Sequence, residues 1–219
     1  MLKKILSDLE ASKTCLVAVS KTKPQEQITA LYNQGQRIFG ENRVQELAEK
    51  HEALPKDIQW HMIGHLQSNK VKYMAEFVTM IHSVDNFKLL KEINKQAAKH
   101  DRVIQCLLQF KIAQEETKTG FDLDSAQAML ADDDFSDLKN IRICGVMGMA
   151  TFTDLESQVR AEFQKLKQIS EKLKSTYFKT DPHFSEISMG MSGDYKIAIE
   201  EGSTMVRIGS LLFGKRNYS

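Results

Sequence analysis

The sequence predicts an α/β fold, a single (β/α)8 TIM barrel with an extra N-terminal helix. Two observations carry this prediction: eight short apolar runs recur along the 219 residues, and longer segments with helical apolar spacing separate them. Parallel strands buried on both faces read as continuous runs of Val, Ile, Leu, Met and Phe. A doubly wound open sheet is the alternative, because an error of one or two strands would change the count.

The expected elements follow one another in strict alternation. The expected strands cover residues 14–21, 37–41, 58–64, 78–84, 103–111, 141–149, 184–190 and 204–209. The expected helices cover residues 2–12, 24–36, 43–53, 66–77, 86–100, 122–131, 154–177 and 194–201. Pro24 suits a first helical turn, and the last long helix carries apolar residues at spacings of three and four. Because these units use nearly all of the chain, we expect residues 1–219 to form one domain.

Composition excludes several classes of protein. The formal charge of +1, from 30 basic and 29 acidic side chains, gives no electrostatic footprint for nucleic acid or an anionic membrane. No window approaches 18 consecutive apolar residues, and the opening residues lack a signal-peptide pattern. Cys15, Cys106 and Cys144 lie in apolar stretches and are expected to be buried thiols of a reducing compartment. We therefore expect a cytoplasmic protein.

The segment LVAVSKTKP, residues 16–24, places a lysine where an apolar strand ends. Val17, Val19 and Lys21 share one strand face, so Lys21 is expected at the barrel mouth if Val19 faces the lumen. Functional groups of such barrels come from the carboxyl ends of strands. Burial lowers the pKa of a lysine, and a neutral amine can form an imine with an aldehyde. The alternative is a lysine that extends its ammonium group to solvent.

The ends of the last two strands carry a second set of candidates. Ser192, between two glycines and before a helix, offers free backbone N–H groups that suit a phosphate. A capped surface loop is the alternative. Arg207 interrupts an apolar run and needs either a carboxylate partner or a ligand acceptor. Gly209 and Ser210 follow it, where barrel enzymes often complete a phosphate site.

Two further motifs allow less specific interpretations. Asn42, in FGENRVQE, could bond a ligand hydroxyl or cap the following helix. His61 and His65 are four residues apart across a strand-to-loop junction, so they lack the helical spacing of a zinc pair and predict no metal site. His82 has no ligand spacing either, and the chemistry of Met147 and Met149 suggests no ligand role.

Taken together, VAVSKTKP, FGENRVQE, WHMIGHLQSNK, SMGMSGD and VRIGSLLFG resemble the ordered motifs of the pyridoxal phosphate homeostasis protein family. The resemblance spans nearly the whole chain and implies a barrel similar to the N-terminal domain of alanine racemase. It implies pyridoxal 5′-phosphate (PLP) as cofactor, with Lys21 as the Schiff-base lysine. It also implies phosphate contacts from Ser192, Gly209 and Ser210 with Ser188 nearby, Arg207 at the pyridine nitrogen, and Asn42 near the 3′-hydroxyl.

The resemblance implies a monomeric PLP-binding protein of vitamin B6 homeostasis, not an enzyme. A donor-only arginine at the pyridine nitrogen keeps that nitrogen unprotonated, which weakens the cofactor as an electron sink. No catalytic residue is assigned, and PLP-dependent apo-enzymes are the expected partners for delivery. The alternatives are a PLP-dependent amino-acid racemase and a phosphosugar aldolase that uses Lys21; the second does not explain the run of motifs.

Overall fold

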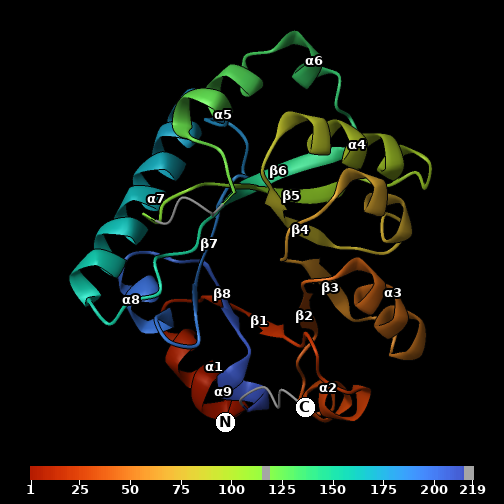
Figure 1. The fold of residues 1–219 in the computed structure, drawn as a ribbon, viewed down its shortest axis with the longest axis vertical. Coiled ribbons are helices and arrows are strands. Elements are labelled where there is room, and N and C mark those ends of the chain that lie inside the picture. Colours follow the sequence, from red (N-terminus) through yellow and green to blue (C-terminus); the bar gives the residue numbers. More distant parts are fainter. Residues whose placement is uncertain (115–118, 215–219) are drawn as a thin grey trace.

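In the computed structural model of the protein, eight parallel strands close into a barrel in the order of the sequence (Figure 1). The strands are β1 (Cys15–Val19), β2 (Ile38–Glu41), β3 (Gln59–Met62), β4 (Met80–Val84), β5 (Ile104–Gln109), β6 (Ile141–Met147), β7 (Glu186–Met191) and β8 (Met205–Ile208). Strand β1 pairs with both β2 and β8, so the sheet has no free edge. The structure describes residues 1–114 and 119–214. The predicted barrel is confirmed, and the open sheet is wrong.

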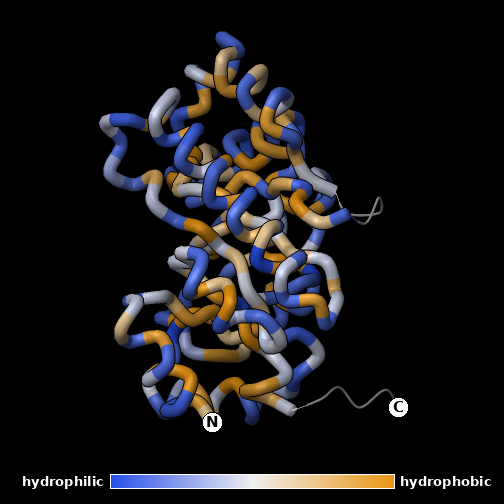
Figure 2. The backbone as a smooth tube through the Cα atoms, turned by 90° about the vertical axis from the view of Figure 1, so that its left-hand side faces the viewer, coloured by the Kyte–Doolittle hydropathy of each residue, from blue (hydrophilic) through white to orange (hydrophobic). Residues whose placement is uncertain are grey.

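Helices surround the barrel on its outer face (Figure 1). They are α1 (Leu2–Glu10), α2 (Gln25–Tyr32), α3 (Val44–Ala53), the 3₁₀ helix η1 (Ser68–Tyr73), α4 (Phe87–Ala98), α5 (Leu123–Leu130), α6 (Asp133–Ser136), α7 (Glu156–Thr176), α8 (Tyr195–Glu200) and α9 (Ser210–Phe213). Figure 2 shows hydrophobic and hydrophilic residues alternating along them, as expected for helices that pack one face on a sheet. Within the described ranges, no helix has the length and apolar character to cross a bilayer.

Three helical segments differ from the sequence prediction. The helix expected over 66–77 is instead η1, which forms i→i+3 bonds such as Lys70 N–H to the Gln67 carbonyl at 2.9 Å. The rest of the connection between β3 and β4 is turn and loop, so one short 3₁₀ helix stands where a longer α-helix was expected. Helices α6 and α9 have four residues each and were not predicted, because a single turn carries no periodic signal.

The lumen of the barrel is filled in layers. A cluster of apolar side chains from five strands packs across it. Its buried members are Val17, Met80, Leu107, Cys144, Met147 and Met205. A larger apolar cluster joins the outer faces of the strands to the helices. The lumen is therefore filled by side chains, and ligand sites of such barrels lie at the carboxyl ends of the strands.

The three cysteines are free thiols, and two of them, Cys106 and Cys144, are buried. Burial raises the pKa of Cys15 and of Cys144 to about 11, and it raises the pKa of Cys106 further still. All three therefore remain protonated near neutral pH. This chemistry suits packing residues and not nucleophiles.

Candidate functional site

A cavity of about 430 Å³ opens at the carboxyl ends of the strands. Six of the seven residues predicted for a site line it together: Lys21, Asn42, Ser192, Arg207, Gly209 and Ser210. The seventh, Ser188, is fully buried in β7 and contacts the cavity only through Arg207. Met149 also lines the cavity, whereas Met147 packs in the apolar layer below. The sequence thus located one site from segments at opposite ends of the chain.

Lys21 enters the cavity from a tight turn after β1. Val17 packs in the lumen, and both Val19 and Lys21 line the cavity, as their shared strand face predicts. The Lys23 N–H group donates to the Ser20 carbonyl at 3.0 Å, which closes the turn around Lys21 and Thr22. Lys21 is half-buried. Its side chain therefore starts from a fixed backbone at the cavity wall.

Two loops from adjacent strands form the side of the cavity beyond β7 and β8. The Gly209 N–H group donates to Ser192 Oγ at 3.3 Å, which joins the loops. Asp194 Oδ1 accepts from the Met191 N–H group and closes the first loop on itself. In the described parts of the chain, four backbone N–H groups of these loops donate to no protein acceptor. They belong to Ser192, Gly193, Ser210 and Leu211. Such a concave group of N–H donors suits an anion.

Arg207 lies at the bottom of the cavity and is almost completely buried. Its guanidinium donates to the Ser188 carbonyl at 2.8 Å, to Ser188 Oγ at 2.6 Å and to the Gly148 carbonyl at 3.0 Å. Burial lowers the pKa of Arg207 to about 10, and the carboxylate of Asp194 opposes this shift. Arg207 therefore remains a cation at neutral pH. The carboxylate ion pair considered from the sequence does not form among the described residues.

A chain of buried hydrogen bonds continues from Arg207 into the lumen. Ser188 Oγ lies 3.0 Å from His82 Nδ1, and His82 Nε2 lies 2.9 Å from His61 Nδ1. Arginine can only donate, so Ser188 Oγ accepts from Arg207 and its hydroxyl proton is available for a hydrogen bond to His82. Which ring donates in the His82–His61 bond depends on the ring tautomers. Burial lowers the pKa of His61 to about 3 and that of His82 well below its ordinary value. Both rings are therefore neutral.

The sequence did not predict this series of hydrogen bonds. His61 pairs with His82 across neighbouring strands, whereas His65 is exposed and lies 3.4 Å from Asp85. The sequence feature that could have indicated these hydrogen bonds is a histidine inside each of two neighbouring apolar strands. Among the described residues, no group of three His, Cys, Asp or Glu side chains is arranged to hold a metal ion.

Asn42 lines the cavity after β2, beside Gly64 of the loop that follows β3. A Cβ atom on Gly64 would lie 2.4 Å from the Asn42 carbonyl oxygen, so only glycine allows this close approach. Helix α3 begins after Arg43 and receives no side-chain cap. The capping alternative for Asn42 is therefore wrong, and its amide remains available to a ligand.

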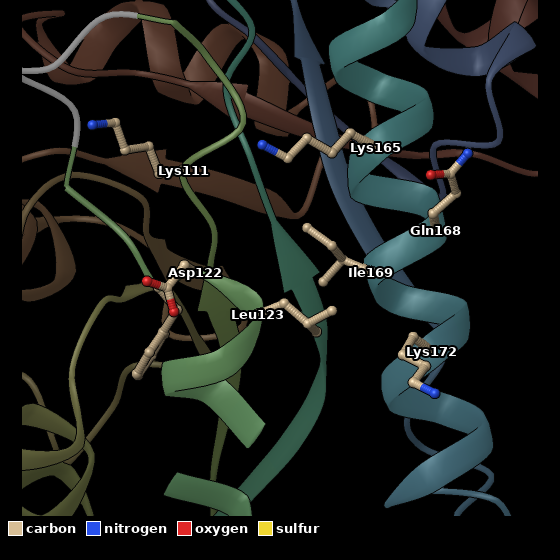
Figure 3. Close-up of a pocket in the computed structure, with 8 residues that line it drawn as sticks. Lys111, Asp122, Leu123, Lys165, Gln168, Ile169 and Lys172 are labelled. Atoms are coloured by element: carbon tan, nitrogen blue, oxygen red, sulfur yellow. The ribbon is translucent and has the colours of Figure 1, made fainter. Parts of the chain in front are cut away.

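A second cavity, of about 500 Å³, lies on the outside of the barrel between α5 and α7 (Figure 3). Leu123 and Ile169 face each other across it, and Lys111, Lys165 and Lys172 stand at its edge. All three lysines are exposed. Among the described residues, no buried polar atom without a hydrogen-bond partner belongs to a residue that lines this cavity, so it lacks the features of a specific site. The cavity at the barrel mouth remains the candidate.

Comparison with known proteins agrees with this geometry. The family model for the alanine racemase N-terminal domain matches residues 2–217. The pyridoxal phosphate homeostasis protein of Aquifex aeolicus is 42% identical over 204 residues, which cover 93% of this chain and 87% of the relative. The chain belongs to the pyridoxal phosphate homeostasis protein family. A second member, from Vibrio alginolyticus, is 41% identical over 210 residues, covering 93% of this chain and 87% of the relative.

Solved structures have the same barrel. PipY of Synechococcus elongatus PCC7942, solved with PLP bound, superposes with a TM-score of 0.86 at 34% identity. The match covers 98% of this chain and 100% of PipY. The alanine racemase of Clostridium difficile 630 has a TM-score of 0.74 at 15% identity, and the match covers all of this chain but 60% of the racemase. The second likeness shows that the two proteins share the barrel fold.

Proposed function

We propose that this protein binds PLP as a Schiff base on Lys21 and buffers or delivers it in cellular vitamin B6 homeostasis. One observation carries the proposal: a single cavity combines an amine, a concave group of N–H donors and a buried guanidinium. The names of the curated relatives and the PLP-bound state of PipY support it. The cavity volume of about 430 Å³ is within the range of cofactor sites.

In this proposal Lys21 forms the covalent link. Its Nζ, in the unprotonated form, would condense with the aldehyde carbon: a C=N bond would form, and the aldehyde oxygen would leave with the two amine protons as one water molecule. No oxidant or reductant is needed, and water reverses the step. A reversible link keeps the free concentration of a reactive aldehyde low while the cofactor stays recoverable. The free thiols of the chain agree with action in the reducing cytosol, and we propose that the protein acts there as a monomer.

The other lining residues would hold and orient the cofactor. Ser192, Gly209 and Ser210 would bind the phosphate through the N–H groups described above. Arg207 would donate to the pyridine nitrogen, and Ser188 would act through Arg207. Asn42 would lie on the side of the 3′-hydroxyl. The residues present therefore fit the group at its aldehyde, its phosphate and its ring.

The phosphate assignment predicts strong discrimination between PLP and pyridoxal, which lacks the phosphate. Two or three charge-assisted hydrogen bonds correspond to several kcal/mol, so PLP should bind at least about 100-fold more tightly. Titration of the protein with each aldehyde, followed by absorbance, measures the two affinities. Equal affinities would show that Ser192, Gly193, Gly209 and Ser210 do not form the phosphate site.

The cavity supports a carrier better than an amino-acid enzyme. PLP supplies an electron sink, and that sink is strong when the pyridine nitrogen is protonated. The Arg207 cation cannot accept a proton from that nitrogen or stabilise one on it. In the described part of the chain, no tyrosine, histidine or cysteine lines the cavity. Besides Lys21 and Arg207, the titratable lining residues are Lys23, which bonds to the Phe213 and Gly214 carbonyls, and Asp194, which bonds to the Met191 N–H group. A racemase-type enzyme is the second candidate, because the barrel is shared with alanine racemase.

We therefore expect purified holo-protein to show no racemisation, transamination or decarboxylation of common amino acids at enzyme-like rates. A positioned general acid or base contributes about 10²–10⁴-fold in rate, and no tyrosine, histidine or cysteine of the described residues lines the cavity to act as one. The same holo-protein should lose its cofactor to a PLP-dependent apo-enzyme, measured as the activity that the apo-enzyme gains. Turnover above roughly 1 s⁻¹ would contradict the carrier function. Arg207→Glu tests the cause: a carboxylate there should protonate the ring nitrogen and raise any trace activity.

The absorbance spectrum distinguishes a PLP-binding protein from an aldolase that uses Lys21 without cofactor. A cofactor imine on the protein absorbs near the visible edge and bleaches with borohydride, whereas the lysine of an aldolase without cofactor does neither. Protein purified after growth with vitamin B6 should show this absorbance. A colourless protein that also fails to gain colour with added PLP would exclude the proposed function.

A further inference from the structure

The turn that carries Lys21 holds a strained residue. Thr22 has a φ of +63°, a left-handed conformation that β-branched residues rarely adopt. Glycine is the usual residue at this position of a turn, and threonine there costs conformational energy. The turn therefore needs contacts from outside itself to keep its shape.

Those contacts come from helix α3. Glu46 Oε1 accepts from the Thr22 N–H group at 2.6 Å, and Lys50 Nζ donates to the Ser20 carbonyl at 2.7 Å. The Ser20 carbonyl belongs to the peptide group before Lys21, and the Thr22 N–H group belongs to the one after it. Both peptide groups of Lys21 are therefore held by two side chains one helical turn apart.

The two side chains belong to a charged cluster of Glu41, Glu46 and Lys50, in which Glu41 and Lys50 are buried and Glu46 is half-buried. Lys50 Nζ also donates to Glu41 Oε1 at 2.8 Å and to Glu46 Oε1 at 2.6 Å, so its three protons all have acceptors. The side chain of Lys50 is 6% exposed and that of Glu41 is fully buried. Ser20 Oγ donates to Glu41 Oε1 at 2.6 Å. Glu41 Oε1 thus accepts from both Ser20 and Lys50, whereas Glu41 Oε2 has no hydrogen-bond partner among the described residues. The bonds made through Glu41 Oε1, Glu46 Oε1 and Lys50 Nζ hold the three side chains in one arrangement.

None of the three charged residues lines the cavity, so the cluster cannot act by touching a ligand. Glu41 and Glu46 both belong to the FGENRVQE motif, of which the proposed function uses only Asn42. We infer that Glu41, Glu46 and Lys50 are positioning residues that hold the Ser20–Lys23 turn so that the Lys21 amine meets the cofactor aldehyde. This inference rests on the proposed function. It assigns the cluster to the covalent step and not to recognition of the phosphate or ring.

Two ligands separate these steps. PLP reports covalent capture through its absorbance, whereas pyridoxine 5′-phosphate carries an alcohol in place of the aldehyde and reports binding without condensation. Glu46→Ala removes the acceptor for the Thr22 N–H group, Glu46→Gln keeps a carbonyl oxygen there, and Glu49→Ala changes an exposed residue of the same helix. If Glu46→Ala does not fold, Glu46→Asp replaces it, because the shorter side chain keeps the charge but withdraws from Thr22.

We expect Glu46→Ala to slow covalent capture about ten-fold or more, the effect of one hydrogen bond to a charged group, with unchanged affinity for pyridoxine 5′-phosphate. Glu46→Gln should recover most of the rate, and Glu49→Ala should match the wild type. Capture by Glu46→Ala at the wild-type rate would overturn the inference, as would a parallel loss of affinity for pyridoxine 5′-phosphate. A wild-type protein that binds neither ligand would overturn the proposed function and this inference with it.

Discussion

Substitution of Lys21 with alanine is expected to abolish covalent capture of PLP. Alanine has no amine, so no C=N bond can form with the aldehyde. Wild-type protein treated with PLP and borohydride should gain the mass of one reduced cofactor on the peptide that contains Lys21. Lys21→Ala should gain none and should lose the absorbance of the imine. Intact and peptide mass measurement together read both results.

Lys23→Ala is the matched control, because Lys23 also lines the cavity two residues away. Its Nζ donates to the carbonyl oxygens of Phe213 and Gly214 at 3.0 and 3.2 Å, which holds it at the edge of the cavity. This variant should still be trapped on Lys21. A mass increment that maps to Lys23 or Lys111 in the wild type would show that the strand-face argument chose the wrong amine.

Acid is expected to destabilise the fold strongly through the two lumen histidines. Burial lowers the pKa of His61 to about 3, whereas the unfolded chain takes up a proton near the ordinary value of 6.5. Between these values the unfolded state binds more protons, so the free energy of unfolding falls as the pH falls. From pH 7 to pH 5 this loss is about 2 kcal/mol for one such histidine. The lowered pKa of His82 acts in the same direction.

Urea unfolding at pH 7 and pH 5 measures this loss, and His61→Gln isolates it. The variant cannot take up the proton, so its stability should fall by about 2 kcal/mol less than that of the wild type over the same interval. His100→Gln is the control, since His100 is exposed and should leave the wild-type difference unchanged. The same pH dependence in His61→Gln and in the wild type would show that His61 is not held neutral. Burial raises the pKa of Glu41, which makes the fold more stable as the pH falls and so opposes the effect of the histidines. The contribution of His61 is therefore measured by the difference between the variant and the wild type, and not by the wild type alone.

The sequence predicted the barrel and most of its mouth because both depend on local pattern. Each parallel strand is buried on two faces, so an apolar run such as residues 103–111 marks β5 (Ile104–Gln109) directly. Polar residues at the ends of such runs mark the mouth, and this rule found Lys21, Asn42 and Ser192. The fold and the candidate residues could therefore be predicted from separate segments of the sequence.

The buried polar contacts that support the cavity could not be predicted from separate segments. His61 meets His82, and Lys50 meets Ser20, only after separate strands and helices have packed together. Ser188 had been expected beside the phosphate, but its buried side chain supports Arg207 instead. Spacing along the chain does not specify which buried polar groups become partners across strands. Such pairings depend on the register of the closed barrel.

The pairing of β1 with β8 also fixes when the cavity can come into existence. Ala18 lies opposite Ile208 in this pair, so the turn with Lys21 and the loop with Gly209 and Ser210 are neighbours only across the last strand pair to be synthesised. During synthesis, Lys21 leaves the ribosome long before the residues of β8 have been added to the chain. The amine then has neither Arg207 beneath it nor the second loop beside it. Cofactor capture by growing chains would thus report the moment at which the sheet closes on itself.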